Sequence, residues 1–286
     1  MAKRIKAYLQ LTKPRITVLV ILTTVAGYLF AGGASVLDSR LRYLVAASVL
    51  GCSGSAVLNQ YLERDFDARM RHTCKRPIPA GLIEPVQALN FGILLVLAGV
   101  IVASVKVNLL AAFLILLTAF IYIVIYTPMK RVSWLSTSIG AISGALPPLT
   151  GWGAASGAIA PKAWILFLIL FLWQHPHFYA IGWMYREDYA TGGFKILSVI
   201  DSEGRRAFRH ILIFTLLLVP VSVLPYVFGL SGIRYGVGSL LLGIMPLVFS
   251  VKLFFSRSDS DTRSLFKATL AYLPALMIVM ILDSVL

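Results

Sequence analysis

Three oxygen-bearing side chains, Asn59, Glu63 and Asp67, recur at every fourth position at the end of a long apolar run. If a helix continues through them, they lie on one face and span roughly 12 Å. Carboxylates beside hydrocarbon are costly unless they pair or bind a cation. A hard divalent cation such as Mg²⁺, shared with a phosphate group, suits such a row of oxygens. We call these three residues the acidic stripe and expect metal-assisted phosphate chemistry there.

The charges of this segment also permit a plainer interpretation. Basic residues are interspersed with the stripe and follow it, and mixed charges are common in solvated loops. The acidic groups would then only balance their basic neighbours, which are Arg64, Arg69, Arg71, Lys75 and Arg76. From this segment alone, both interpretations stay open.

A second polar connection also carries acidic residues. Glu187 and Asp188 follow an apolar run that lies four runs further along the chain, and Lys195 comes after a Gly-Gly pair. A repeated polar feature at this spacing is typical of internal duplication in membrane proteins. We therefore expect two acidic clusters that face each other across a helix bundle.

A cationic cluster ends the fourth apolar run, where Tyr126 is followed by Lys130 and Arg131. Two adjacent cations can neutralise the oxygens of a phosphate or diphosphate, and the Tyr126 hydroxyl adds a donor. An interfacial tyrosine with a membrane-surface anchor explains the same residues without a ligand.

The sixth apolar run contains Trp173, His175 and His177 around Pro176. Histidines inside a membrane span are candidates for haem contacts, proton carriers or hydrogen-bond partners. The alternative is a buried histidine that bonds a backbone carbonyl freed by Pro176.

The composition indicates an integral membrane protein. The chain has 286 residues, of which 58% are hydrophobic and 13% charged, and its mean hydropathy is +0.84. Such values exclude an ordinary soluble domain. The net charge of +14 falls in short clusters between apolar runs, which favours membrane topology over nucleic-acid binding. The two cysteines imply no disulfide framework, and we expect one membrane domain over residues 1–286.

The apolar runs predict an all-α polytopic protein, because a backbone in lipid must satisfy its own hydrogen bonds. We expect the first run to be a retained span and not a signal peptide. Glycines with Pro147 and Pro148 mark the fifth run as a closely packed helix that the prolines can break. The expected nine spans are Ile16–Ala34, Tyr43–Leu62, Ala88–Val105, Leu109–Tyr126, Leu135–Trp152, Ala163–Met184, Ile211–Gly229, Tyr235–Phe255 and Ala268–Val285.

Positive charge sets the expected orientation. Of the 26 Lys and Arg residues, 21 fall on the side that holds the N-terminus and the acidic clusters. Short connections rich in Lys and Arg stay in the cytoplasm. We therefore expect a cytoplasmic N-terminus in a bacterial inner membrane, and a central cavity that opens to the cytoplasmic side.

Several motifs in order resemble the UbiA superfamily of intramembrane aromatic prenyltransferases, and in particular its haem branch. They are LTKPRITVLV, the stripe with RHTCKRPIPAG, YTPMKR, LPPLTGW and WQHPHFYAIGWMYREDY. Two features depart from the wider pattern. Many members carry Asp where this chain has Glu63, and the second acidic motif is reduced to Glu187 and Asp188.

The resemblance implies that Mg²⁺ joins the diphosphate of farnesyl diphosphate to the two acidic motifs. The implied metal ligands are Asn59, Glu63, Asp67 and Asp188. These four residues and Lys130 are also the implied catalytic residues. The implied diphosphate-binding residues are Arg76, Lys130, Arg131, Tyr126 and Lys195.

On the acceptor side, the resemblance implies attack by a vinyl group of haem b and addition of water, which gives haem O and diphosphate. His177, together with His175 and Trp173, is expected on the haem side. A homo-oligomer and delivery of product to a terminal oxidase or haem A synthase are compatible with this role. Membrane lipid surrounds the expected bundle.

Two other functions compete with this one. An enzyme of the same family would prenylate an aromatic acid in quinone biosynthesis, and the WQHPHF segment and the stripe with its additional Asp65 favour the haem branch over it. A secondary transporter for an anionic substrate would need ionisable groups deep within its spans. Here almost all of them fall at the ends of spans on one side.

Overall fold

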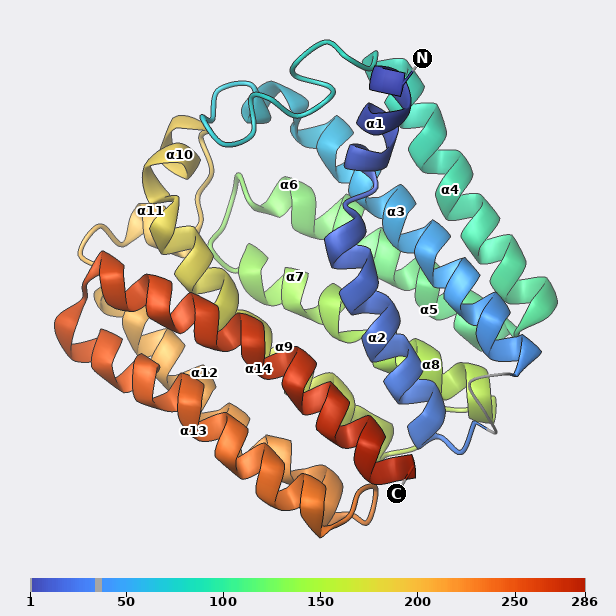
Figure 1. Ribbon diagram of the computed structural model, residues 1–286. Coiled ribbons are helices and arrows are strands. Elements are labelled where there is room, and N and C mark those ends of the chain that lie inside the picture. Colours follow the sequence, from blue (N-terminus) through green and yellow to red (C-terminus); the bar gives the residue numbers. More distant parts are fainter. Residues whose placement is uncertain (1, 34–37, 286) are drawn as a thin grey trace.

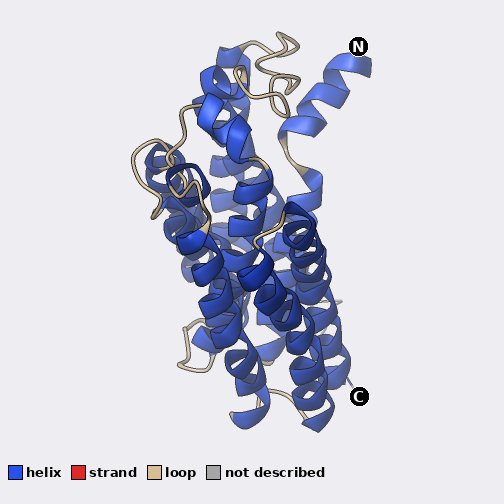
Figure 2. Ribbon diagram, turned by 90° about the vertical axis from the view of Figure 1, so that its left-hand side faces the viewer, coloured by secondary structure: helices blue, strands red, loops and turns tan. Residues whose placement is uncertain are grey.

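The computed structural model describes residues 2–33 and 38–285, and these residues form helices and connections without a strand. This confirms the expected all-α class. The helices run roughly along the long axis of the molecule (Figure 2) and form a ring around the cavity described below. The N-terminus and the C-terminus lie at opposite ends (Figure 1).

One half of the ring contains the stripe. It comprises α1 (Ala2–Leu11), α2 (Pro14–Phe30), α3 (Ser39–Asp67), α4 (Pro85–Lys106) and α5 (Leu109–Phe120). The chain then passes through the π-helix η1 (Ile121–Tyr126) into α6 (Thr127–Met129). Helix α3 packs along α4, and α4 packs against α5.

The other half is formed by the remaining long helices, α9 (Ala163–Met184), α12 (Arg205–Val227), α13 (Ile233–Ser256) and α14 (Asp259–Val285). Short α10 (Arg186–Thr191) and α11 (Leu197–Ile200) follow α9 at the end where α1 lies. Contacts of α14 with α2, and of α9 with α7 (Ser136–Ala145), the helix that follows α6, join this half to the first.

The fifth expected span is broken as the prolines predicted. Leu135–Trp152 is occupied by α7 (Ser136–Ala145) and α8 (Pro147–Ser156), which meet at Leu146. Pro147 starts α8, where its missing N–H does least harm. Glycines let α8 approach α2, since a Cβ on Gly151 would overlap the Thr24 carbonyl oxygen.

Within the described residues, seven helices are long and apolar enough to cross a membrane. An eighth span is added if α1 and α2, which are bent by 43°, count as one. Neither α7 nor α8 is long enough alone, because each has ten residues. The multi-pass membrane class is confirmed, whereas the count of nine, which depends on α7 and α8, stays a prediction.

Candidate active site

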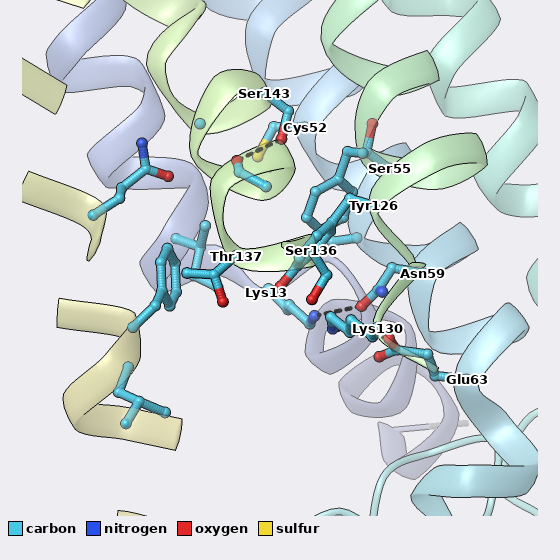
Figure 3. A pocket seen from close by; sticks show the side chains of 18 of the residues that line it. Lys13, Cys52, Ser55, Asn59, Glu63, Tyr126, Lys130, Ser136, Thr137 and Ser143 are labelled. Carbon is cyan, nitrogen blue, oxygen red and sulfur yellow. Dashed lines mark hydrogen bonds and ion pairs between the residues drawn. The ribbon is translucent and has the colours of Figure 1, made fainter. Parts of the chain in front are cut away.

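A cavity of about 350 Å³ lies at the centre of the ring, and α2, α3, α7 and α9 all contribute to its wall (Figure 3). All three stripe residues line it. Asn59, Glu63 and Asp67 belong to the last turns of α3 and are at most 4% exposed. The helical spacing therefore places three polar groups on one buried face, as expected from the sequence.

Each stripe residue has one cationic partner. Lys130 Nζ lies 2.8 Å from Glu63 Oε1, and Arg76 Nη1 lies 2.7 Å from Asp67 Oδ2. Lys13 Nζ donates to Asn59 Oδ1 over 3.1 Å (Figure 3). The plainer interpretation, pairing with basic residues, is thus correct for Arg76, but the pairs lie in a buried cavity and not in a solvated loop.

Asn59 is held at both ends of its amide. Its Nδ2 donates to Thr127 Oγ1 over 3.0 Å, while its Oδ1 accepts from Lys13. Thr127 in turn donates to the Tyr122 carbonyl oxygen over 2.8 Å, across the turn of η1. The π-helix therefore supports the orientation of Asn59, and π-turns of this kind are frequent at functional sites.

The cations respond to this environment in different ways. Burial acts to lower the pKa of Lys130, but the Glu63 carboxylate outweighs it and holds that pKa well above its ordinary value. Burial and then the nearby Arg76 charge lower the pKa of Lys13 to about 8. Lys130 is thus fixed as a cation, whereas Lys13 is poorly compensated in the same cavity.

The stripe fits a hard metal ion such as Mg²⁺. Asp67 Oδ1 is buried and has no hydrogen-bond partner among the described residues, so one carboxylate oxygen is left for a ligand. Within residues 2–33 and 38–285, no three His, Cys, Asp or Glu side chains converge into a complete metal site. Mg²⁺ commonly takes only one or two carboxylates and completes its shell with water and substrate phosphate.

Aromatic rings form the wall beside Lys130. Its Nζ lies 4.6 Å from the centre of the Tyr126 ring and 5.9 Å from that of Phe194. Tyr122, Tyr126 and Tyr189 all line the cavity. Burial raises the pKa of Tyr189 to about 12, so its phenol remains a donor. Gly140 leaves room for Tyr126, because a Cβ there would lie 2.7 Å from the ring.

The second acidic cluster does not join the stripe. Asp188 is not among the described residues that line the cavity. It lies 2.5 Å from His72 Nδ1, and hydrogen bonds with His72 hold its pKa below the ordinary range. His72 does line the cavity. Asp188 therefore contacts the site through His72, and its role as a metal ligand stays a prediction.

Two expected diphosphate-binding side chains also lie off the cavity wall. The Arg131 guanidinium packs 4.6 Å from the centre of the Phe66 ring. The Lys195 backbone N–H donates to the Lys130 carbonyl oxygen over 2.8 Å, so Lys195 fixes the chain near Lys130. Neither belongs to the described lining. The structure supports Arg76, Lys130 and Tyr126 as the cavity-facing members of that set.

The expected haem-side cluster is turned into the helix packing. Trp173 Nε1 donates to the Thr269 carbonyl oxygen over 2.7 Å, and His177 Nδ1 lies 3.0 Å from Thr269 Oγ1. His175 lies 2.8 Å from the Phe171 carbonyl oxygen and stacks on Phe214. None of the three lines the cavity described here. Their haem-side role stays a prediction, which this placement does not favour. The histidines are buried and hydrogen-bonded, but their Nδ1 atoms bond the Phe171 carbonyl and the Thr269 hydroxyl and not the Leu172 carbonyl that Pro176 frees.

Sequence reasoning missed Lys13, Thr127 and His72 as site residues. Lys13 precedes Pro14 at the start of an apolar span, and that dipeptide is the only local signal. Thr127 and His72 reach the site through η1 and the loop after α3, which no spacing rule reveals.

Polytopic helices around a buried, cation-lined oxygen stripe define a membrane protein with a charged site inside its helix bundle. The model of the UbiA prenyltransferase family matches residues 20–273. The chain therefore belongs to the UbiA prenyltransferase family and is a membrane-embedded prenyltransferase.

Relatives and solved structures agree with this assignment. The chain is 42% identical over 285 residues to a protein named protoheme IX farnesyltransferase from Solibacter usitatus, covering 96% of this chain and 98% of the relative. A protein of the same name from Aquifex aeolicus is 36% identical and covers 98% and 96%.

The fold matches a solved structure of a digeranylgeranylglyceryl phosphate synthase, with a TM-score of 0.82, 19% identity and coverage of 100% of this chain and 99% of that one. It also matches a UbiA homolog from Archaeoglobus fulgidus bound to GPP and Mg²⁺, with a TM-score of 0.66, 17% identity and coverage of 96% and 99%. At these identities the likeness concerns the fold.

Proposed function

We propose that this prenyltransferase transfers a farnesyl group from farnesyl diphosphate to a vinyl group of haem b, with addition of water. The observation that carries the proposal is the match, over almost the whole chain, to relatives named protoheme IX farnesyltransferase. The cavity supports it because a cationic, oxygen-rich end adjoins an aromatic and apolar wall.

The charged end of the cavity would bind the diphosphate. Lys130 and Arg76 lie beside the stripe and can take up the negative charge that develops as the C1–O bond of the donor breaks. The Tyr126 hydroxyl can donate to the same group. Asn59, Glu63 and Asp67 would hold Mg²⁺, which when bound neutralises the diphosphate as a Lewis acid.

The aromatic wall would receive the organic part. Loss of diphosphate leaves an allylic cation, which the faces of Tyr122, Tyr126 and Phe194 can stabilise. Apolar side chains from α2, α3 and α5 limit the access of water to it; they are Ile16, Val20, Ala56 and Ile115.

The C1–O electron pair leaves with the diphosphate, and the vinyl π electrons then form a carbon–carbon bond to C1 of the resulting farnesyl cation. The new cation next to the porphyrin ring accepts a water oxygen, and that water releases one proton. The two products are diphosphate and a hydroxyethylfarnesyl haem, which is haem O.

Incubation of the detergent-solubilised protein with haem b, farnesyl diphosphate and Mg²⁺ tests the proposal. Liquid chromatography with mass detection should show haem that gains one farnesyl group and one hydroxyl group, and a chelator should stop this gain. Unchanged haem together with prenylation of added 4-hydroxybenzoate would show that the acceptor is an aromatic acid. The enzyme class would stand in that case, and the haem assignment would fall.

A further inference from the structure

Lys13 is the cation of the site that neither sequence reasoning nor the proposed reaction uses. It lines the cavity, and its Nζ donates to Asn59 Oδ1 over 3.1 Å (Figure 3). Lys130 and Arg76 each pair with a carboxylate, whereas Lys13 bonds a neutral amide. Two carboxylates therefore face three cations, and one positive charge is left without an anion in this set.

The backbone around Lys13 is fixed by packing. Helix α1 ends at Leu11, which is fully buried, and Gln60 Nε2 donates to the Leu11 carbonyl oxygen over 2.8 Å. Gln60 directly follows Asn59 in α3, so one helix both anchors the end of α1 and accepts the Lys13 side chain. The break between α1 and α2 is thus held at a set position beside the stripe.

Lys13 also has an unfavourable backbone conformation. Its φ of 49° and ψ of 62° lie in the left-handed region, and Lys13 and Arg257 are the non-glycine residues with positive φ in the described part of the chain. This backbone conformation is strained for a residue with a side chain, and it persists only where the surrounding structure holds it in place. Pro14 has no backbone N–H to satisfy at the first position of α2, so the helix can begin directly after the bend at Lys13. In this conformation the Lys13 side chain points into the cavity.

A metal ion and the Lys13 ammonium compete for one atom. Asn59 Oδ1 is the amide oxygen that a Mg²⁺ bound to the stripe would use, and it is the acceptor of the Lys13 hydrogen bond. The lysine side chain is a flexible four-carbon stem that ends in a compact charge. It can leave Asn59 for a diphosphate oxygen nearby without movement of the backbone.

We propose that Lys13 is a diphosphate-binding residue that exchanges partners, covering Asn59 Oδ1 in the empty site and turning to the diphosphate when metal and substrate bind. This role deepens the proposed function. It rests on that function only in requiring a prenyl donor that carries a diphosphate. Lys13 then competes with the metal ion for Asn59 Oδ1 when diphosphate is absent. When diphosphate is present, Lys13 and the metal ion bind it together.

That double role separates the proposal from a merely structural clamp. If Lys13 served only to join the break between α1 and α2 to α3, its removal would loosen Asn59. The affinities for the metal ion and for diphosphate would then both fall. Partner exchange requires effects of opposite sign on the two ligands.

The experiment uses full-length protein in detergent as Lys13→Met, Lys13→Arg and Lys6→Met. Lys6 is an exposed residue of α1, so its variant carries the same charge change away from the cavity. Two constants are measured, for Mn²⁺ alone by electron paramagnetic resonance, and for inorganic diphosphate with saturating Mg²⁺ by calorimetry.

For Lys13→Met, the Mn²⁺ affinity should rise by about 3-fold or more, and the diphosphate affinity should fall by about 10-fold or more, as for a lost charge-assisted hydrogen bond. Lys13→Arg should retain diphosphate affinity within about 3-fold, because its charge is kept. Lys6→Met should change neither constant by more than about 2-fold, since exposed charges are screened.

Loss of both affinities in Lys13→Met, or no change in either, would overturn the proposal. Because neither ligand is a porphyrin, failure of haem farnesylation would leave this result untouched. Failure of partner exchange would equally leave the reaction itself standing.

Discussion

Lys130 Nζ lies 2.8 Å from Glu63 Oε1, although the two residues are 67 positions apart in the chain. Their side chains are 15% and 6% exposed. The contact joins the end of α6 to the end of α3 and places a permanent cation against the stripe. The electrostatics of the proposed reaction depend on this pair.

Lys130→Met should lower the turnover number by about 100-fold or more, since one donor to a developing anion contributes on this scale. It also leaves the buried Glu63 without its cation, which costs stability of about 3 kcal/mol. The rate of haem farnesylation and the melting temperature in detergent measure the two effects. Lys75→Met, which removes an exposed charge from the loop after α3, is the control and should retain turnover within about 2-fold. Equal losses in both variants would contradict a specific role for Lys130.

Asp67 and Asp65 provide a matched pair for the metal site. The Asp67 side chain is fully buried, and one of its oxygens has no partner among the residues that the structure describes, whereas the Asp65 side chain is 68% exposed. Asp67→Asn should lower activity by about 100-fold or more through loss of a ligand charge to Mg²⁺. Asp65→Asn should stay within about 3-fold of the parent, because a surface charge matters little. Titration of activity with Mg²⁺ checks both, and an equal response of the two variants would remove Asp67 from the metal site.

Gly151→Ala should destabilise the junction of α2 and α8. The new Cβ would overlap the Thr24 carbonyl oxygen, and backbone on both sides leaves little room to relax. We expect a loss of about 1 to 3 kcal/mol, as for overpacking of a filled core. Gly153→Ala is the comparison, because its Cβ would meet the movable ends of Leu110 and Ile159 at 2.9 to 3.2 Å. Thermal unfolding in detergent should place Gly153→Ala closer to the parent.

His177→Phe decides between the two interpretations of the histidine cluster. The ring packs between Trp173 and Phe266, and its Nδ1 lies 3.0 Å from Thr269 Oγ1. A packing role predicts a stability loss of about 1 kcal/mol from the missing hydrogen bond, with unchanged haem affinity. Spectroscopic haem titration and thermal unfolding are measured on the same sample. A tenfold loss of haem affinity at an unchanged melting temperature would restore His177 to the haem side.

The stripe could be predicted from the sequence because it depends only on the spacing of residues within one helix. Positions 59, 63 and 67 share a helical face wherever that helix lies, and their polarity beside an apolar run already required cationic or metal partners. The break of the fifth span at Pro147 was equally local, since proline removes a donor and starts helices well. The WQHPHF segment shows the limit of the same reasoning. Its residue types suggested a ligand, but which way each ring points depends on α12 and α14.

Taken alone, the sequence determined an all-α membrane protein, the stripe and two of its three cationic partners, Arg76 and Lys130, because hydrophobic length, helical period and charge are properties of short segments. Only the tertiary structure decided which cation pairs with which oxygen. Lys13 reaches Asn59, Lys130 reaches Glu63, and Asp188 contacts His72. These pairings join segments 46 to 116 residues apart, and they follow from helix packing and the π-turn of η1, which no local pattern encodes.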